Sequence, residues 1–198
     1  MQRLSAVFFL ILLIGCGGSN YQTLDSNAVI LAFGDSLTAG VGTSKENNYP
    51  TVLAQMSGRR VVNAGISGET TAGGLQRFAD LLDQHSPSLV ILLEGGNDIL
   101  RNIAPGNTKN NLAEMIGAAK QRQIPLLLIG VPERSWFSNS ADFYEELAAE
   151  HEVLFMDDMV ADLLRSPGLK SDAVHLNAAG YRQMAREIFD FLGDHGLF

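Results

Sequence analysis

Runs of consecutive apolar residues recur along this chain, and each is followed by a loop that contains glycine. The first run covers residues 29–33 and ends in Gly-Asp-Ser-Leu at 34–37. A second run begins at Leu89 and leads through Glu94 into Gly-Gly-Asn-Asp at 95–98. Uninterrupted apolar runs of this kind are typical of strands buried on both faces of a parallel sheet. A chain built in this way needs helices on both sides of its sheet.

Helical periodicity appears between the apolar runs. Strands are predicted over residues 29–33, 60–63, 89–94, 125–130 and 153–156. Apolar residues three and four positions apart predict helices over 49–56, 75–85, 107–122, 141–150 and 177–192. Residues 131–140 are expected to be irregular and 157–173 to be mostly loop. Because strand and helix alternate, we predict an α/β fold, a three-layer α/β/α sandwich with a doubly wound parallel sheet.

The composition indicates one compact domain and restricts the class of partner. The chain has 198 residues, of which 46% are hydrophobic, and a formal net charge of −8. No basic cluster is longer than the pair Arg59 and Arg60, so a nucleic-acid partner is disfavoured. Cys16 is the only cysteine, so no internal disulfide can form, and no Cys/His group has the spacing of a zinc site. We expect a monomer that needs neither a metal nor a cofactor.

The N-terminal segment has the features of an export signal. Arg3 precedes an apolar stretch, 4–14, that is too short to cross a bilayer of about 30 Å but fits the core of a signal peptide. Leu-Ile-Gly-Cys at 13–16 resembles the lipobox of bacterial lipoproteins. The resemblance implies cleavage before Cys16, lipid attachment to Cys16, and anchoring of the exported protein to the cell envelope on its periplasmic face. The alternative is an ordinary secretory signal in which Cys16 occurs by chance.

This interpretation divides the chain into three parts. Residues 1–15 are a lipoprotein signal peptide, 16–26 are a tether, and 27–198 are a single folded domain. The tether begins with Gly-Gly-Ser-Asn at 17–20, a composition typical of flexible linkers. No internal repeat or second domain boundary is visible in the sequence.

Residue types that fit acyl transfer follow several of the predicted strands. Ser36 lies just past a strand end, where open α/β sheets place their ligands. A serine hydroxyl is a weak nucleophile until a base removes its proton. His175 is a candidate for that base, and Asp172 for the anion that orients its imidazole. The backbone N–H groups of Ser36 and Gly68 and the side-chain amide of Asn97 could donate to the oxyanion of a tetrahedral intermediate.

Four segments together resemble the sequence blocks of the SGNH (GDSL) hydrolases. They are Gly-Asp-Ser-Leu at 34–37, Asn-Ala-Gly-Ile-Ser-Gly-Glu-Thr at 63–70, Gly-Gly-Asn-Asp at 95–98 and Asp-x-x-His at 172–175. They occur in the order of the family, and its small bacterial thioesterase, lysophospholipase and arylesterase enzymes are the most similar subgroup. The resemblance implies a flavodoxin-like sandwich and hydrolysis of acyl esters or thioesters through an acyl-enzyme.

The resemblance also implies a role for each candidate residue. Ser36 is then the nucleophile, His175 the general base and acid, and Asp172 the residue that orients His175. The oxyanion hole consists of the Ser36 backbone, Gly68 and Asn97. No catalytic position departs from the pattern of the family. The implied substrate is a small acyl ester or a lysophospholipid, and a membrane anchor would bring the enzyme close to such lipids.

Two other functions are open at this stage. The same site could remove O-acetyl groups from carbohydrate, such as cell-wall glycan. A surface binding module on a hydrolase fold that has lost its activity is a non-enzymatic alternative. The complete set of candidate catalytic residues is an argument against this second possibility.

Other polar residues near these blocks have simpler interpretations. Asp35 and Asp98 are expected to support the loops of Ser36 and Asn97 rather than to act as acids. The remaining histidines have no carboxylate in a local motif and are expected to lie at the surface or to cap helices; they are His85, His151 and His195.

Two further segments are candidates for the walls of a substrate groove. Trp136 and Phe137 lie in a loop with proline and serine, so they could line an acyl groove or belong to the core. Residues 99–105 follow the Gly-Gly-Asn-Asp block and could form a mobile lid over that groove.

Overall fold

A computed structural model of the chain describes residues 21–133 and 139–198. Within these residues a sheet of five parallel strands has the order β2-β1-β3-β4-β5. The strands are β1 (Val29–Gly34), β2 (Arg60–Gly65), β3 (Leu89–Leu93), β4 (Leu126–Ile129) and β5 (Leu154–Met156). This order is that of flavodoxin-like doubly wound sheets. The predicted α/β class and parallel sheet are therefore confirmed.

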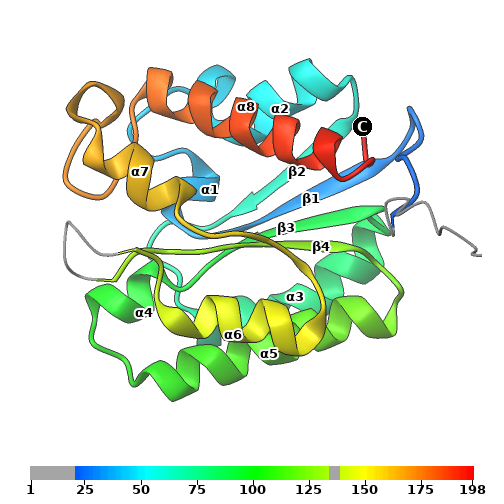
Figure 1. The fold of residues 1–198 in the computed structure, drawn as a ribbon, viewed down its shortest axis with the longest axis horizontal. Helices are drawn as coiled ribbons and strands as arrows, with labels where there is room; N and C mark the ends of the chain where they lie inside the picture. The colour runs from blue at the N-terminus through cyan, green and yellow to red at the C-terminus, as the bar shows by residue number, and fades with distance from the viewer. Residues whose placement is uncertain (1–20, 134–138) are drawn as a thin grey trace, which may run out of the picture.

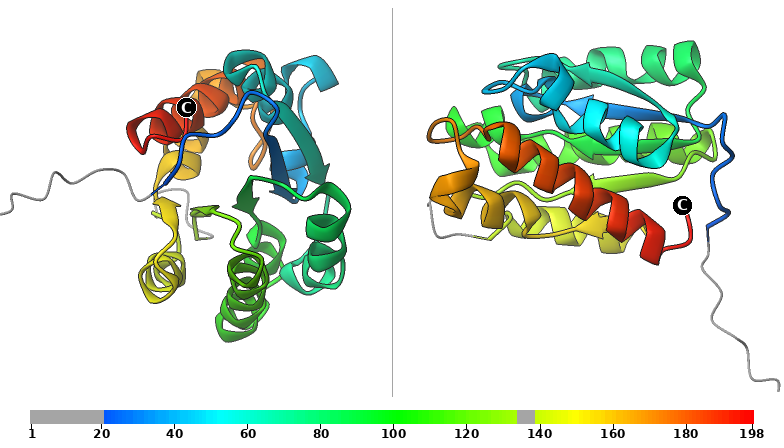
Figure 2. Two further views of the ribbon diagram at one scale, coloured as in Figure 1. Left: turned by 90° about the vertical axis from the view of Figure 1, so that its right-hand side faces the viewer. Right: turned by 90° about the horizontal axis from the view of Figure 1, so that it is seen from above.

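Helices cover both faces of the sheet (Figures 1 and 2). One layer contains α1 (Ser36–Ala39), α2 (Tyr49–Ser57), α7 (Met159–Arg165) and α8 (Ala178–Asp194). The other contains α3 (Thr71–His85), α4 (Gly96–Leu100), α5 (Pro105–Gln121) and α6 (Asp142–His151). Short 3₁₀ turns occur at η1 (Lys45–Asn47) and η2 (Pro167–Leu169). The three predicted layers are present.

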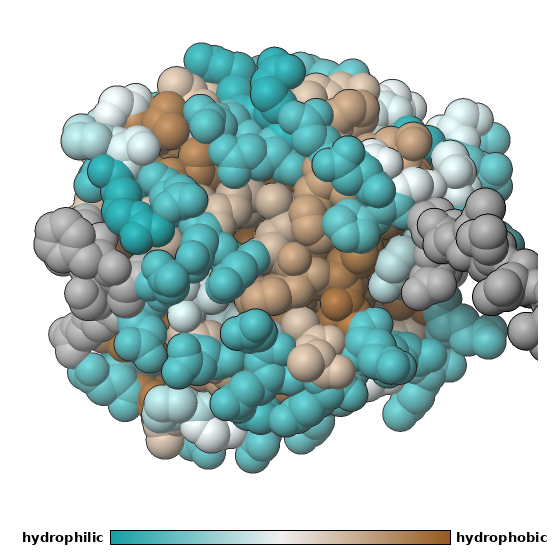
Figure 3. Space-filling view, viewed as in Figure 1, coloured by the Kyte–Doolittle hydropathy of each residue, from teal (hydrophilic) through white to brown (hydrophobic). Residues whose placement is uncertain are grey.

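The central strands and the inner faces of the helices form the core. β3 and β4 are buried at every position, as expected for strands covered on both sides. On α8 the predicted inward face is fully buried, including Tyr181, Met184 and Ile188. Figure 3 shows a band of apolar residues between α8 and α6, over an edge of the sheet that the helices do not fully cover.

The prediction that residues 157–173 are mostly loop was wrong. They contain α7 and η2. Val160 and Leu163 of α7 are buried, with the three-residue spacing of a helix. A helix of seven residues that is closed by Pro167 shows too few turns for its periodicity to stand out in the sequence.

The described chain enters the domain ahead of β1. The Leu24 N–H donates to the Leu197 carbonyl at 2.9 Å, and the Arg59 side chain donates to the Leu24 carbonyl at 2.6 Å. Leu24 is buried, so the polypeptide is fixed to the domain three residues before the expected start at 27. Among the helices of the described residues, none combines the length and the apolar character that crossing a membrane would require.

Candidate active site

The candidate residues lie where the strands end at their carboxyl termini. β1 lies between β2 and β3 at this edge, where Gly34 pairs with Gly65 of β2 on one side and with Leu93 of β3 on the other. The loops that follow these three strands are therefore neighbours. Ser36 begins α1 directly after β1, and Asn97 lies in the first turn of α4 after β3. This is the edge at which doubly wound sheets bind ligands.

Ser36, His175 and Asp172 form a continuous chain of hydrogen bonds. The Nε2 atom of His175 lies 3.0 Å from Oγ of Ser36. Its Nδ1 atom lies 2.8 Å from Oδ2 and 3.0 Å from Oδ1 of Asp172. A carboxylate can only accept, so Nδ1 carries the proton and Nε2 is left to accept the serine proton. The geometry is that of a serine nucleophile next to an oriented general base.

The segment that carries His175 is held against the loop that follows α1. A bond from the Ser171 N–H to the His175 carbonyl, at 3.0 Å, closes this segment on itself. The Tyr181 hydroxyl of α8 donates to the Val41 carbonyl at 2.8 Å. Gly42 has a φ of +96°, and a Cβ there would lie 2.2 Å from the Ser171 hydroxyl oxygen. Glycine at 42 thus permits the close approach that joins two parts of the chain far apart in sequence.

Asp172 is suited to stay ionised. Partial burial raises its pKa, but hydrogen bonds from the Val174 N–H and from the His175 ring and N–H lower it, and the net pKa is below the usual value. The backbone N–H groups of Val174 and His175 each donate to Oδ1 of Asp172 at 2.9 Å. An anion at this position favours an imidazolium on His175 during the reaction.

The expected oxyanion donors line one cavity with Ser36. Gly68 and Asn97 both contribute to its wall. Gly68 has a φ of +80°, a left-handed conformation that favours glycine, and its carbonyl accepts a 2.8 Å bond from the Arg101 side chain. The backbone of Ser36 lies at the first turn of α1, where N–H groups lack helical partners.

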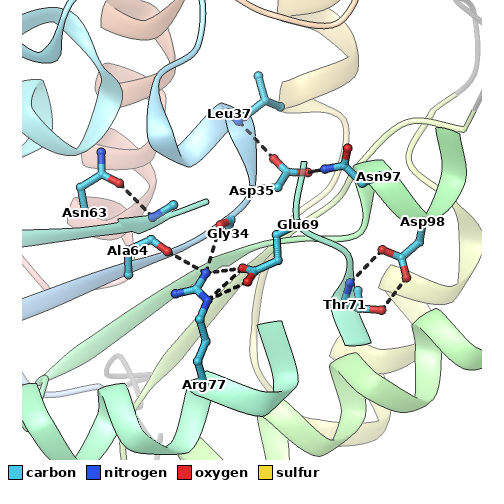
Figure 4. A network of polar contacts seen from close by, with 11 residues as sticks. Gly34, Asp35, Leu37, Asn63, Ala64, Glu69, Thr71, Arg77, Asn97 and Asp98 are labelled. Atoms are coloured by element: carbon cyan, nitrogen blue, oxygen red, sulfur yellow. Dashed lines mark hydrogen bonds and ion pairs between the residues drawn. The ribbon is translucent and has the colours of Figure 1, made fainter. Parts of the chain in front are cut away.

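Asp35 and Asp98 are both buried and both bond to neighbouring loops (Figure 4). Asp35 accepts from the Leu37 N–H and from the Asn97 side-chain amide, each at 3.1 Å. Burial raises the pKa of Asp35 to about 6, although these bonds and the charge of nearby His175 act in the opposite direction. Asp98 accepts from the N–H and the hydroxyl of Thr71, at 2.8 and 2.6 Å. Asp35 therefore contacts both loops that it was expected to support, whereas Asp98 joins the loop of Asn97 to the start of α3.

The cavity above Ser36 has a volume of about 500 Å³. Much of its wall is apolar, which is typical of sites that take a small organic ligand. Many of the apolar side chains come from α4, α7 and the segments at the ends of β3 and β4; these include Leu93, Ile99, Leu100, Val131, Val160, Ala161 and Leu164. The contribution of α7 was missed with the helix itself. Val160 and Leu164 have the four-residue spacing of a helix, but the segment is too short for this spacing to identify one in the sequence.

The other three histidines do not line this cavity. His85 and His151 end α3 and α6, and His195 follows α8, where its Nδ1 lies 2.7 Å from the Phe191 carbonyl. Trp136 and Phe137 lie outside the described residues. Of the expected lid at 99–105, the first two residues line the cavity, while the closing motion stays a prediction. In residues 21–133 and 139–198, no group of His, Cys, Asp and Glu side chains is arranged to hold a metal ion.

Comparison with known sequences gives a consistent picture. A profile of the GDSL-like Lipase/Acylhydrolase family matches residues 32–183. Esterase TesA of Pseudomonas aeruginosa is 38% identical over 127 residues, 61% of this chain and 63% of that protein. Thioesterase 1/protease 1/lysophospholipase L1 of Escherichia coli K12 is 34% identical over 156 residues, 75% of each chain. Uncharacterized lipoprotein YqeF of Bacillus subtilis is 32% identical over 143 residues, 64% of this chain and 56% of that protein.

In the sequence comparison, the chain spans less than two thirds of the length of TesA and of YqeF. The structural comparison with solved structures covers a larger share of this chain. The crystal structure of TesA has a TM-score of 0.76 and 28% identity, and the match covers 84% of this chain and 99% of that one. The SGNH-hydrolase family esterase AlinE4 has a TM-score of 0.68 and 32% identity over 87% of this chain and 98% of that one. The predicted fold class is confirmed by these neighbours.

Proposed function

The chain belongs to the GDSL-like lipase/acylhydrolase family, and from this premise we propose that it is a serine esterase that hydrolyses acyl esters or thioesters. The reaction passes through an acyl-enzyme on Ser36. The observation that carries the proposal is the 3.0 Å contact between Nε2 of His175 and Oγ of Ser36. The bond of Nδ1 to Asp172 leaves Nε2 free to act as a base.

Acylation and deacylation use the same base in turn. His175 removes the Ser36 proton as Oγ bonds to the carbonyl carbon, and the carbonyl electron pair moves onto its oxygen. When the tetrahedral intermediate collapses, the bond to the leaving oxygen or sulfur breaks and His175 returns the proton to that atom. Water then attacks the acyl carbon and gives its proton to His175. Finally the bond to Oγ breaks, Ser36 regains the proton and the carboxylic acid departs.

The negative oxygen of each intermediate needs donors fixed in advance. We assign this task to the backbone N–H groups of Ser36 and Gly68 and to the Asn97 side chain. All three residues border the cavity that contains the nucleophile. Loss of one such donor typically lowers kcat by about 10²–10³-fold. Asn97→Ala is therefore expected to lower kcat in this range.

The apolar wall of the cavity favours an acyl chain over an acetylated sugar. Leu164→Trp on α7 would fill part of the 500 Å³ cavity, so we expect kcat/KM for octanoyl and longer p-nitrophenyl esters to fall roughly tenfold or more. The acetyl ester should be hydrolysed at nearly the wild-type rate. Leu164→Met, which roughly conserves the volume, is the control and should keep the wild-type profile. An unchanged chain-length profile in Leu164→Trp would place the acyl chain elsewhere.

Two assays test the proposed activity against its alternatives. A fluorophosphonate probe should label the wild-type protein and leave Ser36→Ala unlabelled, and a wild-type protein that resists labelling would support a binding module instead. Rates on p-nitrophenyl esters of increasing chain length should exceed the rate on acetylated glycan. A preference for the glycan would assign the site to carbohydrate deacetylation.

We also propose that the protein is exported and anchored through lipid on Cys16. The support is the apolar segment that ends in Leu-Ile-Gly-Cys, together with the relative that is named a lipoprotein. Mass spectrometry of the protein from membranes should find Cys16 as the acylated N-terminal residue, and Cys16→Ser should leave the membrane fraction. An intact or unlipidated N-terminus in the wild-type protein would contradict the anchor.

A further inference from the structure

Asp35 joins the nucleophile segment to the Asn97 amide. Its Oδ1 accepts from the N–H of Leu37, next to Ser36, and its Oδ2 accepts from Nδ2 of Asn97. Both bonds measure 3.1 Å, and Asp35 is only 5% exposed. Figure 4 shows the carboxylate lying between these two groups, which belong to α1 and α4. The buried carboxylate thus spans two loops that both border the reacting atoms.

The bond to Asp35 determines which way the Asn97 amide points. An ionised carboxylate only accepts, so the atom of Asn97 that faces it must be the nitrogen and not the oxygen. The Asn97 nitrogen carries two hydrogens, and one of them is used by Asp35. The second is free to donate, and Asn97 lines the cavity. If the amide were reversed, an oxygen would take the place of that donor and would repel a developing oxyanion.

The backbone of Gly96, next to Asn97, lies close to the Asp35 carboxylate. A Cβ placed on Gly96 would lie 3.0 Å from Oδ2 of Asp35, tighter than ordinary van der Waals contact. Any side chain at 96 would therefore press on the same carboxylate oxygen that holds Asn97. The absence of a side chain at this position is an observation independent of the hydrogen bonds, and it supports the same link.

We propose that Asp35 is a positioning residue for the oxyanion hole, because it holds the Asn97 amide with an N–H directed at the reacting carbonyl oxygen. The inference rests on the proposed esterase function and on the role assigned to Asn97. Asp35 itself transfers no proton in this scheme. It acts through Asn97, and its removal should affect the transition state more than substrate binding.

Asp35 is also the N-cap of α1, so a test must separate capping from positioning. Asn caps helices about as well as Asp does, and Asp35→Asn can keep the bond from the Leu37 N–H. Its other terminal atom then becomes an NH₂ group, which cannot accept from Asn97. The Asn97 amide loses its partner or turns its oxygen toward residue 35. The substitution therefore keeps the cap and breaks the link.

The experiment is a double-mutant cycle on the full-length protein. We expect Asp35→Asn to lower kcat by about ten- to a hundredfold with KM nearly unchanged, which is part of the loss of a whole donor. In the Asn97→Ala background the same substitution should cause little further loss, since the residue through which it acts is gone. Gly96→Ala should also lower kcat, because its Cβ would press on Oδ2 of Asp35.

Asn48→Ala is the matched control. Asn48 is buried and caps α2, where its side chain accepts from the Thr51 N–H at 2.9 Å, and it does not border the cavity. It should lose thermal stability and keep kcat close to wild type. Multiplicative losses for Asp35→Asn and Asn97→Ala, or an equal loss of kcat in Asn48→Ala, would overturn the inference. A wild-type kcat in Asn97→Ala would instead contradict the proposed oxyanion hole, so the two failures can be told apart.

Discussion

Replacement of Ser36 by alanine is expected to lower kcat for ester hydrolysis by about 10⁶-fold, because a nucleophile and its base act as one unit. His175→Ala should cause almost the same loss, since the hydroxyl 3.0 Å from Nε2 would then have no proton acceptor. The double variant should be no slower than either single one. Steady-state rates on a p-nitrophenyl ester, with enzyme concentrations high enough to detect residual turnover, would measure all three.

The loss of kcat should be smaller for substitution of Asp172 than for substitution of Ser36 or His175. Substitution of another histidine should cause no loss. Asp172→Asn keeps the shape of the side chain but changes which imidazole nitrogen holds the proton, and about 10⁴-fold is expected from comparable triads. His85→Ala, at the end of α3, should retain the wild-type rate. Thermal unfolding of Ser36→Ala should resemble that of wild type. Residual activity within a hundredfold of wild type would show that another group is the nucleophile.

The convergence of the loops that carry the candidate catalytic residues could be predicted from the sequence because it follows from the architecture. Parallel strands place all their carboxyl ends at one edge, so loops after β1, β2 and β3 must be neighbours. Ser36, Gly68 and Asn97 each follow one of these strands. His175 precedes the amphipathic helix α8, whose packing on the sheet brings it to the same edge. Hydrophobic periodicity gives the positions of the strands and helices along the chain directly, whereas the flavodoxin-like order of the strands was implied only by the family resemblance.

The wall of the cavity could not be predicted in the same way. A supporting role was expected for Asp35 and Asp98, but the individual contacts that they make were not. α7 is too short to show periodicity, so Val160 and Leu164 were assigned to a loop. The bond between Asp35 and Asn97 joins residues 62 positions apart. Such a contact depends on the register of neighbouring strands and on the close approach of the Gly96 backbone to Asp35. Local residue patterns show neither.

Glu94 is a third buried carboxyl, besides Asp35 and Asp98, and the sequence patterns did not single it out. It ends the apolar run of β3, is fully buried, and lies just before the Gly-Gly-Asn-Asp block. Neither carboxyl oxygen has a hydrogen-bond partner among the described residues. Burial raises the pKa of Glu94 to about 10, and the charges of Asp35, Glu69 and Asp98 add to this more than that of Arg77 offsets. The folded protein therefore holds Glu94 in its neutral form near pH 7.

We expect Glu94→Leu to raise Tm at neutral pH. A buried polar group without a partner costs about 1–3 kcal/mol, and for a chain of this size each kcal/mol corresponds to about 2–4 °C in Tm. The side chains are similar in size, so the core should accept leucine. Calorimetry or circular dichroism would measure the shift. Glu114→Gln, at an exposed position on α5, is the control and should leave Tm unchanged.

The gain in Tm from Glu94→Leu should also increase with pH. In the unfolded chain Glu94 loses its proton near its usual pKa of 4.5, whereas in the folded protein it keeps the proton until about pH 10. Its contribution is therefore most favourable below about pH 4.5 and is progressively lost as pH rises toward 10. The Tm difference between Glu94→Leu and wild type should widen steadily from pH 5 to pH 9. A difference that is constant over this range would mean that Glu94 is ionised in the folded protein and has a partner that stabilises its charge.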